Sequence, residues 1–361
     1  MTLSRLILAQ FRSWARLDLD PDSRPLAIYG ANGAGKTNIL EAVSMLSPGR
    51  GLRQAPPGDQ ARQGPGAGWR IRAQIGEHQV QTGAAPGTPR EVLIDDKPGP
   101  QVALGRMMRV IWLVPAMDRL WTDAPEIRRR FLDRITLSFA PGHAEDALTY
   151  EKAMRERNRL LRDQVGDAGW YRALESQMAA SGAALTRNRL DAIARITQSQ
   201  QGATTAFPAA TLTLLPGEGF ADDADPASIA DRLAATRGRD MAAGRSLSGP
   251  HRADLGAHWG PQDMPAALSS TGEQKALLIS LILANARALS AENPVLLLDE
   301  VAAHLDSDRR AALYDEIIAL PAQSFLTGTG PELFDSFGPR ARYLQITRAG
   351  DSSTAHERDQ P

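Results

Sequence analysis

The stretch GANGAGKTN, from Gly30 to Asn38, constrains the fold more than any other part of the chain. It matches the phosphate-loop pattern G-x-x-x-x-G-K-[ST]. The residues before it, Arg24 to Gly30 (RPLAIYG), are typical of a short buried strand, and Thr37 to Leu46 (TNILEAVSML) of an amphipathic helix. Strand, loop and helix in this order predict an α/β fold in which backbone N–H groups surround phosphate oxygens at a helix N-terminus.

The predicted nucleotide ligands are the residues of this loop: Gly30, Ala31, Asn32, Gly33, Ala34, Gly35, Lys36, Thr37 and Asn38. We expect Lys36 to reach the β- and γ-phosphates of a nucleoside triphosphate, and to face solvent when no nucleotide is bound. Thr37 is expected to ligate Mg²⁺. Lys36 is one of four lysines among 41 Lys and Arg residues. A compact ammonium fits a phosphate cradle where a flat guanidinium would not.

Composition narrows the class of protein. The 361 residues suffice for two or three folding units, and the net charge of −1 gives no global excess of positive charge. The chain has no cysteine, which excludes disulfides, thiolate metal sites and thiol catalysis. We expect neither a signal peptide nor a membrane-spanning segment, and therefore a cytoplasmic protein with no membrane partner.

The N-terminal part is predicted to be rich in strands. Residues 3–20 suggest two strands around a turn, and residues 51–68 a Pro/Gly-rich loop. Residues 69–75 (WRIRAQI) alternate as a strand does, with residues 90–99 as the expected partner strand in a small antiparallel sheet. Residues 109–114 predict a buried strand that ends at Pro115.

The middle of the chain is predicted to be helical and the last part to return to strand–helix alternation. Two long helices, 145–164 and 170–196, form an expected helical hairpin; 211–215 suggests an isolated strand and 226–242 one further helix. Later elements are helices 272–289 and 306–320 and strands 295–298, 324–327 and 343–346. The polar tail from Gly350 is expected to be disordered.

Two carboxylates end the apolar strand at Pro294 to Glu300 (PVLLLDE). With a phosphate loop in the same chain, we expect Asp299 to hold Mg²⁺, directly or through water, and Glu300 to polarise the attacking water. A small-residue helix start precedes this strand, at Ser270, Thr271, Gly272 and Gln274. It is either an ordinary capped helix or a second site where N–H groups face an anion.

The spacing of this helix start resembles the signature motif of ABC-type ATPases, which covers the γ-phosphate bound to another subunit. Four segments then resemble the RecF family of the SMC-like branch: LILAQFRSW, NGAGKTNILEA, PAMDRLWTDAPEIRRRFLD (Pro115 to Asp133) and SGPHRADL (Ser248 to Leu255). This resemblance implies an ABC-type ATPase head with a small antiparallel β subdomain and an inserted, mainly helical second lobe. The implied boundaries are residues 1–115 and 246–361 for the head and 116–245 for the lobe.

The resemblance also implies a function. It points to a weak, DNA-stimulated ATPase that dimerises with ATP, clamps duplex DNA near single-strand gaps, and helps RecO and RecR to load RecA. Arg12 is either a surface arginine at a strand end or a nucleotide contact, and the resemblance favours the second, because the matching arginine of the SMC-like branch contacts nucleotide. The chain departs from the pattern at Ala116, Thr122 and Asp123, and Gly328 stands where transporter ATPases have a switch histidine, with Thr327 or Thr329 as the nearest hydroxyls.

Arginines along the predicted helices leave two interpretations. Arg128, Arg129 and Arg130 at a helix start either contact DNA phosphates or form a solvated face. Arg155, Arg157, Arg159 and Arg162 lie among acidic residues, which favours a solvated face.

Three other classes compete with the RecF-type function. A nucleotide-binding subunit of a membrane transporter is the main alternative, but roughly 230 residues separate the phosphate loop from the signature, more than such subunits use. A small-molecule P-loop kinase has no use for the signature. A structural SMC-type protein would need a much longer coiled-coil arm than the predicted hairpin supplies.

Overall fold

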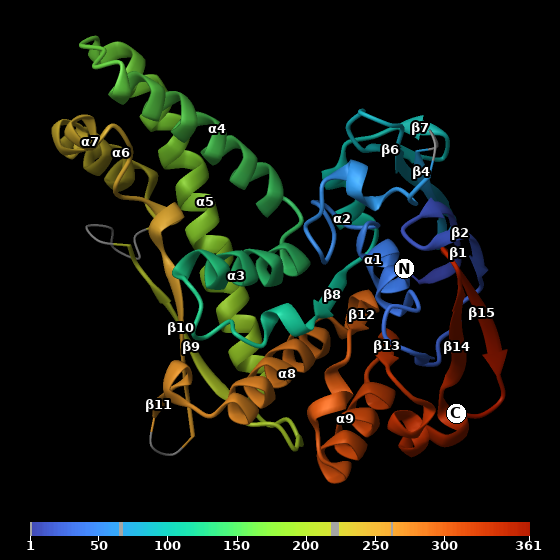
Figure 1. Ribbon diagram of the computed structural model, residues 1–361. Coiled ribbons are helices and arrows are strands. Elements are labelled where there is room, and N and C mark those ends of the chain that lie inside the picture. The colour runs from blue at the N-terminus through green and yellow to red at the C-terminus, as the bar shows by residue number, and fades with distance from the viewer. Residues whose placement is uncertain (1, 65–67, 218–223, 261–262) are drawn as a thin grey trace. The chain divides into compact units, whose positions relative to one another are not determined.

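The computed structural model describes residues 2–64, 68–217, 224–260 and 263–361 (Figure 1). The chain divides into two compact units. The first unit contains Met1–Asp118, Gly202–Pro208 and Leu278–Pro361, and the second contains Arg119–Gln201 and Ala209–Leu277. The predicted α/β class is confirmed, with the phosphate loop in the first unit.

A six-stranded sheet carries the phosphate loop in the order β15-β14-β3-β13-β12-β8. All neighbours in it are parallel except β14 and β15. The predicted strands before Pro115, at 295–298, 324–327 and 343–346 are all present in it. The bounds are β3 Leu26–Tyr29, β8 Val110–Leu113, β12 Val295–Leu298, β13 Gln323–Gly328, β14 Arg342–Ala349 and β15 Ser352–Arg358.

A second, antiparallel sheet of six strands has the order β2-β1-β4-β5-β6-β7. Its bounds are β1 Leu3–Phe11, β2 Trp14–Leu19, β4 Trp69–Ile75, β5 His78–Ala84, β6 Glu91–Ile94 and β7 Lys97–Pro98. The sheet is larger than predicted, because the N-terminal hairpin joins it through β1 and β4. The predicted pairing of residues 69–75 with 90–99 is wrong, because β5 lies between them. The sequence of β5, HQVQTGA, has too few apolar residues to show the alternating pattern of a strand.

One hydrophobic core joins both sheets of the first unit. Helix α1 (Lys36–Ser44) contributes Ile39, Leu40 and Val43 to it, together with apolar residues of both sheets. Figure 1 shows α1 between them. Buried Gln323 adds a polar connection: its amide bonds both the N–H and the C=O of Leu3 at the start of β1. The remaining α-helices of this unit are α2 (Leu104–Met107), α9 (Ser307–Ala319) and the later part of α8 (Thr271–Ala288).

The C-terminal tail is ordered, so the expectation of disorder from Gly350 is wrong. Strand β15 pairs with β14 along its whole length, from Ala349↔Ser352 to Tyr343↔Arg358. Gly350 takes a positive φ of 57° in the two-residue connection, which is the usual geometry of a tight hairpin. Strand β15 is polar, so backbone pairing rather than a hydrophobic pattern places it in the sheet.

The second unit is built on a helical hairpin of α4 (His143–Arg162) and α5 (Ala168–Gln200), as predicted. Helix α3 (Pro125–Phe139) precedes it. The expected single helix at 226–242 is two helices, α6 (Pro226–Ala235) and α7 (Arg237–Ala243), separated at Thr236.

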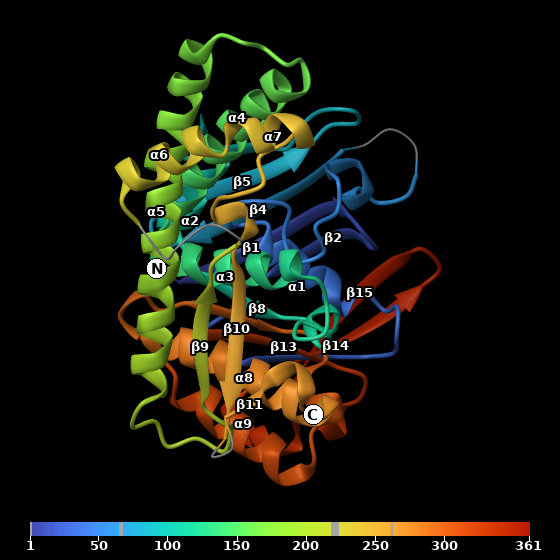
Figure 2. The same cartoon turned by 90° about the vertical axis from the view of Figure 1, so that its left-hand side faces the viewer.

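The prediction of an isolated strand at 211–215 is wrong. This strand is part of β9 (Ala210–Leu215), which pairs with β10 (Asp254–Trp259), and β11 (Met264–Pro265) completes a three-stranded sheet. Figure 2 shows β9 and β10 alongside α5. Leu255 and Ala257 of β10 lie opposite Leu214 and Leu212, so both strands bury the same face.

A buried ionic cluster overturns the interpretation of Arg157 as a solvated residue. Its guanidinium is fully buried and donates to Glu175 Oε1 at 3.1 Å, Asp240 Oδ2 at 2.8 Å and Ser246 Oγ at 2.7 Å. Arg237 gives Glu175 a second cation at 2.5 Å. The cluster joins α4, α5 and α7, so Arg157 fixes the packing of the second unit.

We predict that Arg157→Ala lowers the unfolding free energy of this unit by about 3 kcal/mol, because it leaves buried carboxylates without their cation. Arg155→Ala is the matched control, since Arg155 is exposed on the same helix and pairs with Glu151 across one turn. Urea unfolding followed by circular dichroism measures both. Similar, small losses in the two variants would contradict the structural role of Arg157.

Candidate nucleotide-binding site

The phosphate loop begins where β3 ends, at the carboxyl edge of the parallel strands, and runs into α1. Gly30 has φ 152°, and an added Cβ there would lie 2.2 Å from the carbonyl oxygen of Ile346 on β14. No side chain fits in that space, so the sequence must have glycine where the loop passes β14. The expected strand–loop–helix context is therefore confirmed.

Lys36 is buried in this structure, so the expectation that it faces solvent is wrong. Its side chain folds back over the loop, and Nζ donates to the carbonyl oxygens of Gly30 at 2.8 Å and Ala31 at 3.1 Å. Burial lowers the pKa of Lys36 below its ordinary value, and the carboxylates of Glu300 and Asp299 act in the opposite direction. The loop carbonyls thus hold the ammonium against the loop itself.

Asp299 joins the phosphate loop to the two strands beside it. Its Oδ1 accepts from the Thr37 hydroxyl at 2.8 Å and from the Thr327 hydroxyl at 2.7 Å. Thr327 Oγ1 also accepts from the backbone N–H of Glu300 at 3.0 Å. Of the two hydroxyls considered near the missing histidine, Thr327 is the one bonded to this carboxylate.

The donor set at this point fits Mg²⁺. A threonine hydroxyl and a carboxylate are hard oxygen ligands, and Mg²⁺ is usually held by one or two such groups together with water and substrate phosphates. Within the described residues no cluster of three or more His, Cys, Asp or Glu side chains forms a separate metal site. Thr37 and Asp299 remain the predicted metal ligands.

A cavity of about 230 Å³ opens beside the loop. Glu300 is one of the residues that line it, and the backbone of Glu300 has a left-handed φ of 53°. Such a conformation is uncommon outside glycine, and the role of Glu300 in polarising the attacking water stays a prediction. The lining residues are Gly33, Gly35, Lys36, Thr37, Asn38, Arg53, Glu300 and Arg348.

The two arginines in this lining, Arg53 and Arg348, were not identified from the sequence. Arg53 lies in the Pro/Gly-rich loop after α1, and Arg348 lies on β14 and donates to the carbonyl oxygen of Gly33 at 3.1 Å. No motif marks either residue. Arg53 lies close to the phosphate loop in the sequence, and a cation there favours an anion, so it could have been suspected. Arg348 could not, because its strand reaches the loop only through long-range pairing with β3.

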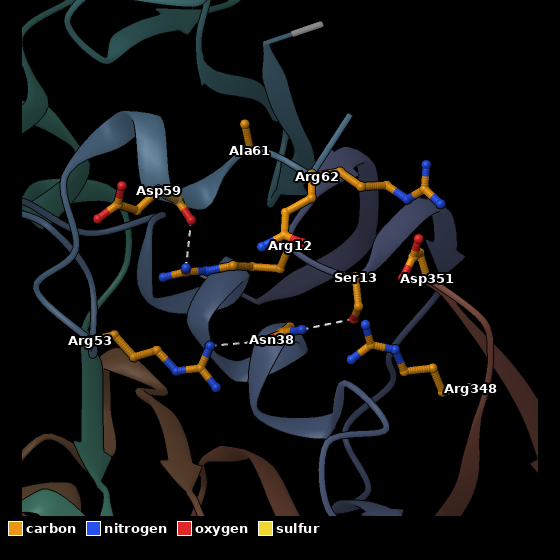
Figure 3. Close-up of a pocket in the computed structure, with 10 residues that line it drawn as sticks. Arg12, Ser13, Asn38, Arg53, Asp59, Ala61, Arg62, Arg348 and Asp351 are labelled. Atoms are coloured by element: carbon orange, nitrogen blue, oxygen red, sulfur yellow. Dashed lines mark hydrogen bonds between the residues drawn. The ribbon is translucent and has the colours of Figure 1, made fainter. Parts of the chain in front are cut away.

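Arg12 and Arg53 share one fully buried carboxylate, that of Glu41 on α1. Arg12 binds it through two nitrogens, at 2.8 and 2.5 Å, and Arg53 at 3.1 Å. Both arginines line a second cavity of about 260 Å³, drawn in Figure 3. Arg12 has φ 53°, a strained backbone that fits a functional position, and its contact with nucleotide stays a prediction.

The predicted signature residues belong to the second unit at the start of α8. Ser270 and Glu273 form a capping box: the Ser270 N–H and hydroxyl both reach Glu273 Oε2 at 2.8 Å. Ser270, Thr271 and Gly272 are exposed, whereas Gln274 is buried and bonds the carbonyl oxygen of Ser269 at 3.0 Å. The capped helix is observed, and a role in another subunit's site stays a prediction.

The three arginines at the start of α3 differ from one another. Arg128 holds Asp254 of β10 through two bonds, and Arg129 donates to the carbonyl oxygen of Ala253. Arg130 is exposed and pairs with Glu126 one turn earlier. Arg128 and Arg129 therefore hold the start of β10 against α3, and a contact of these arginines with DNA phosphates stays a prediction.

Comparison with known proteins decides the family. The DNA replication and repair protein RecF of Rhizobium etli strain CFN 42 is 44% identical over 366 residues, covering 96% of this chain and 97% of that protein. RecF of Caulobacter vibrioides is 44% identical over 377 residues, with the same coverage. The chain belongs to the RecF family. This membership favours the DNA-repair interpretation over a transporter subunit or a small-molecule kinase.

Solved structures agree with the RecF fold. One described as the recombination mediator protein RecF-ATPrS in the RecFOR pathway has a TM-score of 0.82 at 20% identity, covering 99% of this chain and 98% of that chain. The Smc head domain of Pyrococcus furiosus has a TM-score of 0.58 at 16% identity, covering 99% and 96%. The AAA domain family matches residues 5–72, which include the phosphate loop. In the described residues of this RecF-family chain, no helix is long and apolar enough to cross a membrane.

We predict that Lys36→Ala weakens ATP binding by roughly ten- to a hundredfold, because a charge-assisted bond to phosphate contributes about 1.5–3 kcal/mol. Lys97→Ala, on exposed strand β7, is the matched control for the loss of one positive charge. Titration with a fluorescent ATP analogue gives both affinities. Circular dichroism must accompany it, since Lys36 also bonds two loop carbonyls. Unchanged affinity in a folded Lys36 variant would rule out the phosphate-loop assignment.

Proposed function

We propose that this chain is an ATP-driven DNA clamp: it binds ATP and Mg²⁺, dimerises in that state, holds duplex DNA near single-strand gaps, and hydrolyses ATP slowly. The observation that carries the proposal is the arrangement of Lys36, Thr37 and Glu300 around one cavity, with Asp299 bonded to the Thr37 hydroxyl. The family membership supports the DNA-repair context, and the RecF structures described with ATP and ATPrS support the choice of nucleotide.

In the proposed mechanism each residue has a separate task. Lys36 leaves the loop carbonyls and binds the β- and γ-phosphates, and the loop N–H groups surround their oxygens. Mg²⁺ supplies positive charge to the phosphate oxygens when bound, with Thr37 and Asp299 as its protein ligands. Glu300 accepts a proton from the attacking water. The Thr327 hydroxyl bonds both the Asp299 carboxylate and the backbone N–H of Glu300, and so fixes the positions of these two neighbouring residues.

The proposed reaction needs a second subunit to complete the site. Ser270, Thr271 and Gly272 are exposed at the positive, N-terminal end of α8, a position that favours an anion such as the γ-phosphate of a partner copy. We propose that Gln274 supports this turn from behind rather than touching nucleotide. The head segments 1–115 and 246–361 and the lobe 116–245 are the proposed functional domains of each subunit.

The proposed partners follow from the resemblance to RecF. They are duplex DNA at gaps, RecR and RecO as direct partners, RecA as the recombinase loaded by them, and a second copy of this chain. The proposed location is the cytoplasm. ATP hydrolysis serves to open the clamp, so we expect it to be slow and to respond to DNA.

We predict that Ser270→Arg abolishes ATP-induced dimerisation and leaves ATP binding by the monomer intact, because the arginine blocks the interface and not the monomer's own phosphate loop. Ser270→Ala is the control, since it removes the helix cap without adding bulk or charge. Sedimentation velocity with ATP, with ADP and without nucleotide gives the oligomeric state.

A mixture extends this test. Combining Lys36→Ala with Ser270→Arg subunits builds mixed dimers with one intact composite site, so ATPase activity should partly return. Loss of ATP binding in Ser270→Arg alone would show that the helix start only serves its own subunit's fold.

We also predict that ATP tightens the binding of duplex DNA and steepens its salt dependence. The net charge of −1 gives the free monomer little non-specific attraction to DNA, whereas a dimer joins two local basic surfaces. Each added phosphate contact contributes about −0.9 to the slope of log affinity against log salt. Aromatic residues are only 5% of the chain, so no stacking platform for single strands is expected.

Fluorescence anisotropy of labelled duplex and single-stranded DNA over a salt series measures this. Glu300→Gln slows hydrolysis and keeps the ATP state populated during the titration. If Arg130 contacts a phosphate, Arg130→Ala lowers the slope by about one contact. Equal affinity and equal slope with and without ATP would remove the clamp mechanism even if ATP binding stands.

A further inference from the structure

A chain of hydrogen bonds runs beneath the phosphate loop and ends on the C-terminal hairpin. Arg53 donates to Asn38 Oδ1 at 2.8 Å, and Asn38 Nδ2 donates to Ser13 Oγ at 2.8 Å. The hydroxyls of Ser13 and Ser353 lie 2.7 Å apart, and Ser353 Oγ lies 2.5 Å from the carbonyl oxygen of Ala34. Figure 3 shows the part from Arg53 through Asn38 to Ser13.

The Ala34 carbonyl at the end of this series of hydrogen bonds decides which group donates and which accepts in each bond. The carbonyl oxygen of Ala34 can only accept, so Ser353 must donate its single proton there. Ser13 must then donate to Ser353, and it accepts from the Asn38 amide, whose orientation follows from the same pattern. Ser13 and Ser353 are both buried, and each hydroxyl donates once and accepts once. Neither hydroxyl can be removed without leaving a buried partner unsatisfied.

The two serines lie directly against the end of the phosphate loop. Gly35 has φ 113°, and a Cβ at this position would lie 2.5 Å from Ser353 Oγ and 2.6 Å from Ser13 Oγ. The backbone N–H of Ser353 also donates to the carbonyl oxygen of Ser13 at 2.9 Å. Strand β15 therefore holds the turn between β1 and β2 against the last residue before Lys36.

Three successive loop carbonyls are held by side chains from outside the loop. Arg348 of β14 binds Gly33 O at 3.1 Å, Ser353 of β15 binds Ala34 O at 2.5 Å, and Trp14 Nε1 binds Gly35 O at 3.3 Å. In a trans peptide the C=O and the following N–H point in opposite directions. Holding the Ala34 carbonyl beneath the loop therefore turns the Gly35 N–H to the other side.

We propose that Ser353, with Ser13, is a positioning residue for nucleotide binding: it keeps the loop carbonyls turned away from the phosphates and so directs the N–H groups toward them. Without this restraint a carbonyl oxygen can rotate toward the cavity, where it repels phosphate oxygens. The same chain orients Asn38, which holds Arg53 at the cavity. This inference rests on the proposed binding of ATP and assigns a function to the C-terminal hairpin.

Ser353→Ala tests the inference, with Thr354→Ala as the matched control. Thr354 is the next residue of the same strand, is exposed, and its hydroxyl bonds Thr347 across the hairpin at 2.8 Å. We expect the affinities for fluorescent ATP and ADP analogues to fall about tenfold in Ser353→Ala, the factor that corresponds to about 1.4 kcal/mol. Thr354→Ala should stay within about twofold of the unmodified protein.

Two further variants separate positioning from a general loss of stability. Ser353→Thr keeps the hydroxyl and should restore affinity, whereas Ser353→Cys, nearly equal in size but a weak donor, should not. The cysteine variant also gives the answer if Ser353→Ala does not fold. In a double-mutant cycle, Ser13→Ala should cost little further affinity once Ser353 is alanine, because the two hydroxyls act in one chain.

The outcomes distinguish this inference from the proposed function. If the unmodified protein and Thr354→Ala bind ATP, and folded Ser353→Ala or Ser353→Cys binds it equally well, the positioning role is overturned and ATP binding stands. If the unmodified protein itself does not bind either nucleotide, the proposed function fails first. Additive losses in the double-mutant cycle would show that the two serines act separately, which also overturns the proposal.

Discussion

The carboxylate of Asp299 is the point on which the nucleotide site depends. It follows β12, whose register with β13 sets Leu298 opposite Leu326, while β13 sets Gly328 opposite Tyr29 of β3. These parallel pairings bring the ends of three strands to one edge of the sheet. Hydroxyls from α1 and β13 then meet on one oxygen of Asp299. A slip of one residue in either pairing would separate the phosphate loop from the carboxylate.

The opening segment Phe11-Arg12-Ser13-Trp14 shows how a motif can act on a loop that it does not belong to. Phe11 is core, whereas the next three side chains all reach the phosphate-loop region: Arg12 to Glu41, Ser13 to Asn38 and Ser353, and Trp14 to the Gly35 carbonyl. The strained φ of Arg12 allows a tight turn to present three successive residues in this way. This short motif thus acts on the phosphate loop through the positions of three side chains as well as through the charge of Arg12.

Much of the fold could be predicted from sequence, because its signals are local. The phosphate loop, the apolar strands of the parallel sheet and the α4–α5 hairpin each carry a pattern that lies within the segment itself. The missed features depend on distant partners. Strand β15 is polar and forms because β14 is there to pair with it, and Arg157 is buried because Glu175 and Asp240 reach it from other helices.

The candidate site divides in the same way. Lys36, Thr37, Asp299 and Glu300 stand in recognisable motifs, whereas Arg348 and Ser353 have no motif and owe their position to strand pairing alone. The error about Lys36 has another cause. Its ammonium bonds the carbonyl oxygens of Gly30 and Ala31, and the motif specifies the residue type at this position but not these contacts.

The strand order of the parallel sheet has a consequence for biosynthesis. Strand β3 precedes the phosphate loop, yet its two neighbours begin far later in the chain, β13 at Gln323 and β14 at Arg342. During translation β3 is therefore synthesised long before either of its partner strands. Until they are made, its four apolar residues and both of its edges have no partner strand in this sheet. The antiparallel sheet, whose strands lie within the first 98 residues, can form long before. We expect the nascent chain to need protection of β3, by its own antiparallel sheet or by a chaperone, until the last hairpin emerges.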